Sequence, residues 1–373
     1  MFKIRRLFFV FIAAALCVAF SAYSPLLHSA ERIATAATPV AQTTERVKAA
    51  NAFLATLSDE QRQSVIFPFT DSEQRVRWSN FPEGAFSRAG LRWGQLDAVQ
   101  RTALMNLLGT ALSSEGVEMV RKQMAADDVV AATQASGGGH VPPGANAGGG
   151  NGRPPVNFGS DYYYVAFLGT PSTTAPWMLQ YGGHHLAINA TVVGSKVTLS
   201  PTLTGGEPLR FTTNGTPVRI AEDEIDQSIA LLNSLTDVQR NQAIVSDQRV
   251  ALVLGPGKDG QTLPPEGLSG NEMTDRQKQA FLKLIEARLD MLNANDLAVK
   301  MSEVEQNLNE TYFGWWGPTA PATGYFRITG PTVVIEYSPE VIDGDPTNHA
   351  HNMYRDPTNE YGAAWISLQG QGT

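Results

Sequence analysis

One six-residue phrase occurs four times in this chain, and its spacing constrains the fold more than any other feature of the sequence. The copies start at Leu57, Leu96, Leu235 and Met273. In each copy a Ser, Thr or Asp can cap a helix, and a Gln three residues later can reach back to the amide of the cap. Apolar residues then recur at helical spacing. The sequence therefore predicts four capped helices. Their N-caps are Ser58, Asp97, Thr236 and Thr274.

The four phrases pair across the chain at a nearly constant offset. Leu235 lies 178 residues after Leu57, and Met273 lies 177 residues after Leu96. A region rich in β-forming residues follows each pair of helices, at 162–189 and at 311–337. We interpret the pattern as an internal duplication; the alternative is coincidence among common capping residues. The predicted fold class is α+β. It has two similar halves, each a helix pair followed by a mostly antiparallel β-sheet region, packed as one globular unit.

The expected boundaries follow from composition and from this pattern. A signal peptide is predicted at 1–30, a flexible leader at 31–46, one domain at 47–362 and a C-terminal tail at 363–373. Within the domain, the two repeats cover about 47–205 and 222–362, and a Gly-rich loop is expected at 136–155.

The N-terminus is typical of a secretory signal. Lys3, Arg5 and Arg6 are followed by an apolar segment at 7–20 that is short for a membrane span. Small residues offer two cleavage sites, so the mature chain should begin between Ala22 and Ala37. The alternative is an uncleaved anchor. No later segment is apolar enough to span a bilayer, and we expect an exported protein, either periplasmic or extracellular.

Charge and cysteine content exclude several classes of function. The single cysteine, Cys17, lies in the leader, so the mature chain would have no disulfide, no catalytic thiolate and no Cys ligand. Removing the three basic residues of the leader takes the formal net charge from -8 to about -11. An acidic chain without a basic cluster argues against nucleic acid as a partner. A small-molecule or glycan substrate fits better.

Four of the six histidines occur as two close pairs, His184-His185 and His349-Ala350-His351. On a strand, alternate side chains share a face, so His349 and His351 would point the same way. His185 would likewise lie opposite His184. We expect His185, His349 and His351 to converge as ligands of a divalent metal such as Zn, Fe or Cu. His184 is a further candidate ligand, and its alternative is a hydrogen-bonded residue facing the core.

Three more polar residues complete the candidate site. Glu336 is expected near the histidines as a ligand or general base. Arg355 could clamp an anionic group of a substrate, and Asp356 follows it in the same polar run. The alternative is a structural turn at Arg355-Asp356. The histidines themselves could instead form a polar acid-base pocket without metal, or be satisfied structurally in the core.

Several of these segments resemble a known family. They lie at 69–73, 77–82, 90–94, 182–186, 254–260 and 354–359. Together they are similar to the bacterial family catalogued as domain of unknown function 3500. The resemblance covers roughly 47–362, and the Gly-rich insert departs from the usual length. It implies an exported protein with a single family-wide domain, and it implies nothing about mechanism.

From the residues, the leading hypothesis is an exported, His-based, metal-assisted enzyme, most simply a hydrolase. One rival is a non-catalytic extracytoplasmic binding protein with glycans as candidate ligands, because aromatic residues crowd the β-rich regions. The other is a redox metalloenzyme, which would need a redox-active metal.

Overall fold

The computed structural model describes residues 39–136, 155–341 and 345–370. The predicted signal peptide, its cleavage sites and nearly all of the predicted Gly-rich loop lie outside these residues. Helix α2 begins at Pro39, so residues 39–46 are helical and do not belong to a flexible leader as predicted. The predicted C-terminal tail likewise begins with a helix, α11 (Ala363–Gly370).

The first half of the chain contributes α2 (Pro39–Ala55), α3 (Asp59–Val65), α4 (Ser72–Arg75), α5 (Ala98–Ala111) and α6 (Ser114–Ala135). The second contributes α7 (Glu222–Ser234), α8 (Asp237–Ala243), α9 (Asp275–Leu289) and α10 (Ala294–Gln306). All four predicted helix starts are confirmed, each with a complete capping box. Within the described part of the chain, none of the helices is both long and apolar enough to cross a membrane.

The glutamines of the capping boxes also bind one another. The side-chain amide of Gln100 donates to Oε1 of Gln61 at 2.9 Å, and that of Gln277 donates to Oε1 of Gln239 at 2.9 Å. Each of these oxygens also accepts the amide N–H of its own cap residue. One polar side chain per helix therefore caps its own helix and fixes the neighbouring one.

The strands form one large mixed sheet and a small hairpin. The first half supplies β1 (Ile66–Phe67), β2 (Leu91–Arg92), β3 (Tyr164–Leu168), β4 (Trp177–Gly183), β5 (Leu186–Val193), β6 (Lys196–Thr198) and β7 (Thr202–Gly206). The hairpin is β8 (Arg210–Thr213) with β9 (Thr216–Arg219). The second half supplies β10 (Ile244–Ser246), β11 (Leu268–Ser269), β12 (Tyr312–Trp316), β13 (Tyr325–Thr329), β14 (Val334–Pro339) and β15 (Ala350–Arg355).

The central pairing of this sheet joins strands from the two halves. The strand order is β1-β3-β4-β5-β7-β15-β14-β13-β12-β10, with β2, β6 and β11 attached at the sides. β1 runs parallel to β3 and β10 runs parallel to β12, whereas the other pairs of the sheet are antiparallel. The predicted α+β class is confirmed, with helices packed against one large mixed sheet.

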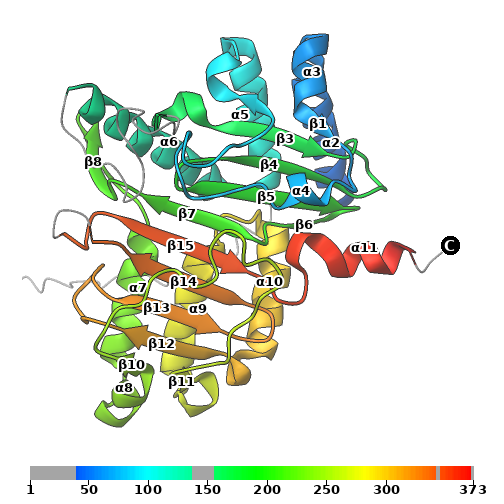
Figure 1. Ribbon diagram of the computed structural model, residues 1–373. Helices are drawn as coiled ribbons and strands as arrows, with labels where there is room; N and C mark the ends of the chain where they lie inside the picture. Colours follow the sequence, from blue (N-terminus) through cyan, green and yellow to red (C-terminus); the bar gives the residue numbers. More distant parts are fainter. Residues whose placement is uncertain (1–38, 137–154, 342–344, 371–373) are drawn as a thin grey trace, which may run out of the picture. The chain divides into compact units, whose positions relative to one another are not determined.

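The two faces of the sheet are covered differently. Figure 1 shows most of the helices on one face, whereas the other face carries irregular segments, including 247–267. Side chains alternate between the faces along each strand. In β15, Asn352 therefore points toward the helices, where its amide donates to Glu224 of α7 at 2.8 Å. His351 points to the opposite face, toward the irregular segments. Loops therefore surround this histidine.

The glutamine contacts between helices predict a measurable loss of stability on substitution. Gln100 is buried, and its amide also donates to the carbonyl of Thr56 at 3.0 Å. Gln100→Ala should lower the free energy of unfolding by about 1–3 kcal/mol, because a cap bond is lost and buried polar groups lose their partner. Gln63→Ala, at an exposed position of α3, should change it by less than about 0.5 kcal/mol. Urea unfolding of both variants measures this, and equal effects would refute it.

Candidate functional site

A pocket of about 460 Å³ opens on the loop-covered face, over the middle of the sheet. Its polar lining comprises Asn80, His184, His185, Glu207, Lys258, Glu340, His349 and His351. Its apolar lining comprises Phe81, Pro82, Ala251, Leu252, Val253, Pro256 and Val341. The pocket has the size and mixed lining of a small-molecule site.

One pair of histidines forms the turn between two strands. Gly183 of β4 pairs with Leu186 of β5, which leaves His184 and His185 as the two residues of a tight hairpin. The expectation that both lie within a strand is therefore wrong. His185 has a φ of +57°, in the left-handed region that costs a non-glycine residue roughly 1–2 kcal/mol. The tight hairpin turns the chain through this conformation, and it leaves the ring of His185 facing the pocket.

The other pair lies at the start of β15. His349 immediately precedes this strand, and His351 lies within it, paired across the sheet with Gly205 of β7. A Cβ on Gly205 would approach the carbonyl oxygen of Ala350 to 2.4 Å. Glycine therefore allows β7 to lie close to β15 where the histidine pair begins.

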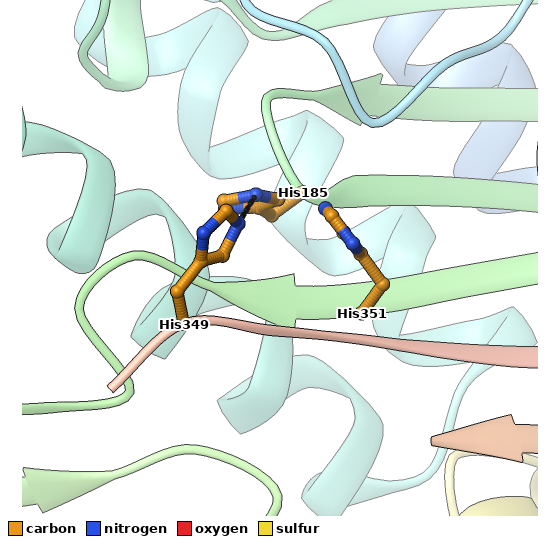
Figure 2. A group of neighbouring side chains, drawn as sticks. All are labelled: His185, His349 and His351. Atoms are coloured by element: carbon orange, nitrogen blue, oxygen red, sulfur yellow. Dashed lines mark hydrogen bonds between the residues drawn. The ribbon is translucent and has the colours of Figure 1, made fainter. Parts of the chain in front are cut away.

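Three of the histidine rings converge, as predicted (Figure 2). The Nε2 atoms of His185 and His349 are 3.0 Å apart. The ring centroid of His351 lies 4.9 Å from that of His185 and 5.0 Å from that of His349. One ring nitrogen from each residue falls within 4.8 Å of the others. This group of His185, His349 and His351, the three-histidine group, could hold a metal ion, and metal binding itself stays a prediction.

The surroundings of His185 favour its neutral imidazole form. Burial, together with the neighbouring histidines, lowers the pKa of His185 well below its usual value. Neutral imidazole is the form that binds a metal. Nε2 of His351 lies 3.0 Å from the side-chain nitrogen of Asn80, and its Nδ1 lies 3.6 Å from the carboxylate of Glu340.

His184 does not turn away from the other histidines, which corrects the expectation that it would face the core alone. It is buried, and its ring stacks on that of His185 with centroids 3.8 Å apart. Nδ1 of His184 lies 2.7 Å from the carboxylate of Asp127, and Nε2 lies 4.0 Å from that of Glu207. His184, His185 and Glu207 form a second group whose ligand atoms lie within 4.8 Å of one another.

Asp127 and Glu207 were missed by the sequence reasoning. Asp127 lies in the helical pattern of α6, 57 residues before His184, and nothing in that pattern marks it. Glu207 follows β7 directly, so its nearness to His184 and His185 depends on the pairing of β7 with β5. Neither position carries a motif that could have revealed it.

Glu336 lies on the same face of the sheet as the histidines, but it does not line the pocket. Its carboxylate accepts the backbone N–H of Leu254 at 2.8 Å and the hydroxyl of Tyr325 at 2.8 Å. Burial raises the pKa of this carboxyl, and these hydrogen bonds oppose the rise. Glu336 thereby fastens the segment 251–256, which forms one wall of the pocket.

Arg355 fastens the same wall. Its Nε donates to the carbonyl of Leu254 at 2.8 Å, and its NH2 group donates to that of Gly255 at 2.9 Å. Its remaining guanidinium nitrogen binds the carboxylate of Glu360. With these partners Arg355 is buried, and it is not among the residues of the described chain that line the pocket.

Asp356 follows the last residue of β15. Arg355 points to the same face as the histidines, and Asp356 points to the opposite face, toward the helices. Its carboxylate pairs with Lys300 of α10 at 2.5 Å and accepts the N–H and hydroxyl of Thr358. These contacts match the structural turn that was the alternative for Arg355 and Asp356. The structure thus brings together the four histidines and leaves the three predicted catalytic residues with structural partners.

Fold and pocket together define an α+β protein with a histidine-rich pocket on the loop-covered face of a mixed sheet. The chain belongs to the family described as Protein of unknown function (DUF3500), which matches residues 40–363. The family resemblance predicted from the sequence is thereby confirmed. No curated protein and no solved structure matches the chain.

The lowered pKa of His185 predicts a loss of stability in acid for the metal-free protein. The unfolded chain takes up the proton below a pH of about 6.5, the ordinary pKa of histidine, whereas the folded state resists it. Unfolding therefore becomes easier as the pH falls below that value and toward the folded pKa.

His185→Asn, which tolerates a positive φ, should show a smaller difference in urea midpoint between pH 8 and pH 5.5 than the unsubstituted protein. The measurement needs chelated protein in both cases. An unchanged difference would show that His185 is not the group responsible.

Proposed function

We propose that the three-histidine group binds a divalent metal ion and that the protein is a metal-assisted hydrolase. The observation that carries the proposal is the 3.0 Å distance between Nε2 of His185 and Nε2 of His349, with His351 beside them. Two nitrogens bound to one tetrahedral zinc ion at 2.0–2.1 Å would lie roughly 3.3 Å apart. The rings are therefore spaced nearly as a metal ion would hold them.

The ligand set suits catalysis better than a purely structural role. Three protein ligands leave one position of a tetrahedral ion for water, and a structural zinc site usually fills all four positions with protein. Here the remaining side is the pocket, whose volume of about 460 Å³ would admit a small substrate. A metal ion in such a site supplies a nucleophilic water near neutral pH.

The walls of the pocket suggest a substrate with an apolar portion and an anionic group. Phe81 and Val341 are about half exposed at the pocket, at 51% and 50%. The exposed Lys258, two residues after the segment 251–256 that Glu336 and Arg355 hold in place, also lines the pocket. We assign Glu336 and Arg355 to positioning this wall, in place of the roles in catalysis and substrate clamping expected from the sequence.

A binding protein is the second candidate, and one observation favours it. The exposed ring of Phe81 beside polar groups is a surface on which a sugar or other flat ligand could stack. Such a protein would take up ligand without any requirement for metal.

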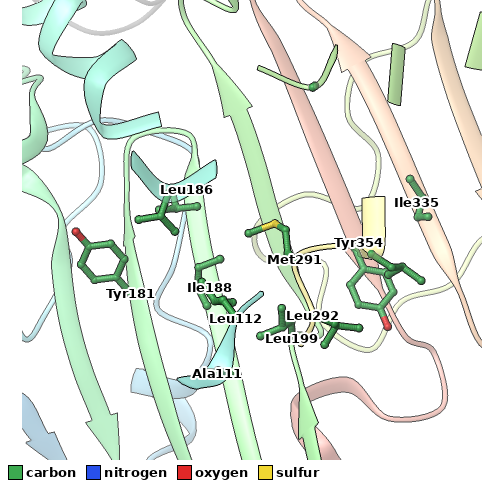
Figure 3. Close-up of a cluster of buried hydrophobic side chains, with 14 of the residues drawn as sticks. Ala111, Leu112, Tyr181, Leu186, Ile188, Leu199, Met291, Leu292, Ile335 and Tyr354 are labelled. Atoms are coloured by element: carbon green, nitrogen blue, oxygen red, sulfur yellow. The ribbon is translucent and has the colours of Figure 1, made fainter. Parts of the chain in front are cut away.

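We also propose that the two halves arose by duplication, and several contacts support this. Leu112 and Leu292 are the residues before the N-caps of α6 and α10, and Figure 3 labels both in one cluster of buried hydrophobic side chains. They pair with each other, and the N–H of Ser113 donates to the carbonyl of Met291. Contact between equivalent positions is typical of a twofold relation. Cross-strand partners repeat as well, since Gln180 pairs with Asn189 and Arg327 with Glu336, both at an offset of 147.

Export is the further part of the proposal, supported by the basic and apolar N-terminal segments. Protein recovered from outside the cytoplasm of the producing cell should begin between Ala22 and Ala37. N-terminal sequencing tests this, and soluble cytoplasmic protein that retains Met1 would contradict it.

Metal analysis tests the proposed site. Protein prepared without a histidine tag and equilibrated with zinc should retain zinc after gel filtration. His349→Ala removes one of the three ligands and should weaken zinc binding at this group at least tenfold. His140→Ala removes a histidine outside the three-histidine group and should leave zinc binding unchanged. Equal zinc binding by both variants would contradict the proposal, and ligand binding without metal would favour the binding protein.

A further inference from the structure

We propose that His184 and Glu207 form a second cation position beside the three-histidine group, so that the pocket holds two divalent ions. The proposal extends the proposed metal site and rests on it. It is carried by the side chains that surround His184.

The tautomer of His184 follows from its carboxylate partner. Oδ1 of Asp127 lies 2.7 Å from Nδ1 of His184, while Oδ2 accepts the backbone N–H of Gly159 at 3.0 Å. An ionised carboxylate only accepts hydrogen bonds, so Nδ1 must carry the proton. In the neutral ring the lone pair is then on Nε2. Metal-binding histidines almost always donate their other ring N–H to a carboxylate, a backbone carbonyl or water, and Asp127 fills this role for His184.

The Nε2 atom of His184 lies near a second carboxylate. Nε2 lies 4.0 Å from a carboxylate oxygen of Glu207, and both residues line the pocket. Two acceptors at this separation are favoured by a cation between them. Two ligand atoms bound to one tetrahedral zinc ion at about 2.0–2.2 Å would lie roughly 3.4 Å apart, so these two atoms would close by about 0.6 Å around an ion.

The ligands divide between two ions more readily than they share one. His185 belongs to both groups, but its Nε2 lies 3.0 Å from that of His349, which assigns this nitrogen to the first ion. One nitrogen lone pair serves one ion. His184 and Glu207 are left for the second ion, with water completing its shell. Pairs of ions at about 3.5–4 Å are used by enzymes that cleave phosphate esters and peptides.

Zinc stoichiometry separates the two positions. Four proteins are each equilibrated with zinc, freed of excess zinc by gel filtration, and analysed for the number of zinc ions per chain. The unsubstituted protein should hold two ions. Glu207→Gln and His349→Ala should each hold one, and the double variant should hold none. Circular dichroism and melting curves confirm that each variant is folded. Glu222→Gln, which changes a half-exposed carboxylate at the start of α7 that pairs with Arg219, serves as the control.

The other outcomes are distinct. One ion that survives Glu207→Gln but not His349→Ala overturns the second position and leaves the proposed function standing. One ion with the opposite pattern overturns the three-histidine site and with it the two-ion pocket, and leaves only a cation position at His184 and Glu207. One ion lost in both single variants means a single shared ion, which overturns the second position, as do two ions that survive Glu207→Gln. No ion in the unsubstituted protein overturns both proposals.

The role of Asp127 gives an independent test that leaves every ligand in place. Asp127→Asn should weaken zinc binding at the second position by about 10–100-fold, with the first position unchanged. Asp128→Asn is the matched control, since Asp128 accepts the N–H of Ser160 at 2.7 Å and is the next residue of α6. Zinc titration against a competing chelator measures both affinities. Equal effects of the two substitutions would overturn the assignment.

Discussion

The pairing of β7 with β15 is the interaction on which the pocket depends. It joins the strands of the two halves into one sheet over five residue pairs, from Tyr354 with Thr202 to Ala350 with Gly206. The backbone hydrogen bonds of this ladder place the start of β15 beside the hairpin that ends β4. Arg288 of α9 reinforces the pairing from the helical side, where it donates to the carbonyl of Thr202 at 2.8 Å. Without this pairing, the histidines would belong to separate sheets.

Local features of the fold could be predicted from the sequence because their causes are local. The capping boxes at Ser58, Asp97, Thr236 and Thr274 depend on residues three positions apart, and all four are present. The convergence of the histidines was also predicted, because each of their two pairs stands beside a β-forming stretch in the sequence. That inference succeeded although the strand assignment of His184 and His185 was wrong. The tight turn still places both side chains at the edge of the sheet where the other pair lies, so the rings converge.

The chemical surroundings of the site could not be predicted, because they depend on packing between distant segments. Glu336, Arg355 and Asp356 have the residue types of a catalytic site, yet each is satisfied by a buried partner. A charged side chain removed from water needs such partners, and sequence alone does not show where they come from. Asp127 illustrates the converse, because an aspartate within a helix has no local mark of the histidine that it orients.

The three histidines come from distant parts of the chain, and a bound metal ion would therefore affect the stability of the fold. His185 and His349 are 164 residues apart in a chain whose one cysteine, Cys17, cannot form an internal disulfide. An ion bound between them would act as a reversible cross-link that closes this long loop and restricts the unfolded chain. The stability of the protein would then rise with the free concentration of metal around it, by RT ln(1 + [M]/Kd) for one site. The histidines proposed to bind the metal would thus make the stability of the fold depend on the metal available around the protein.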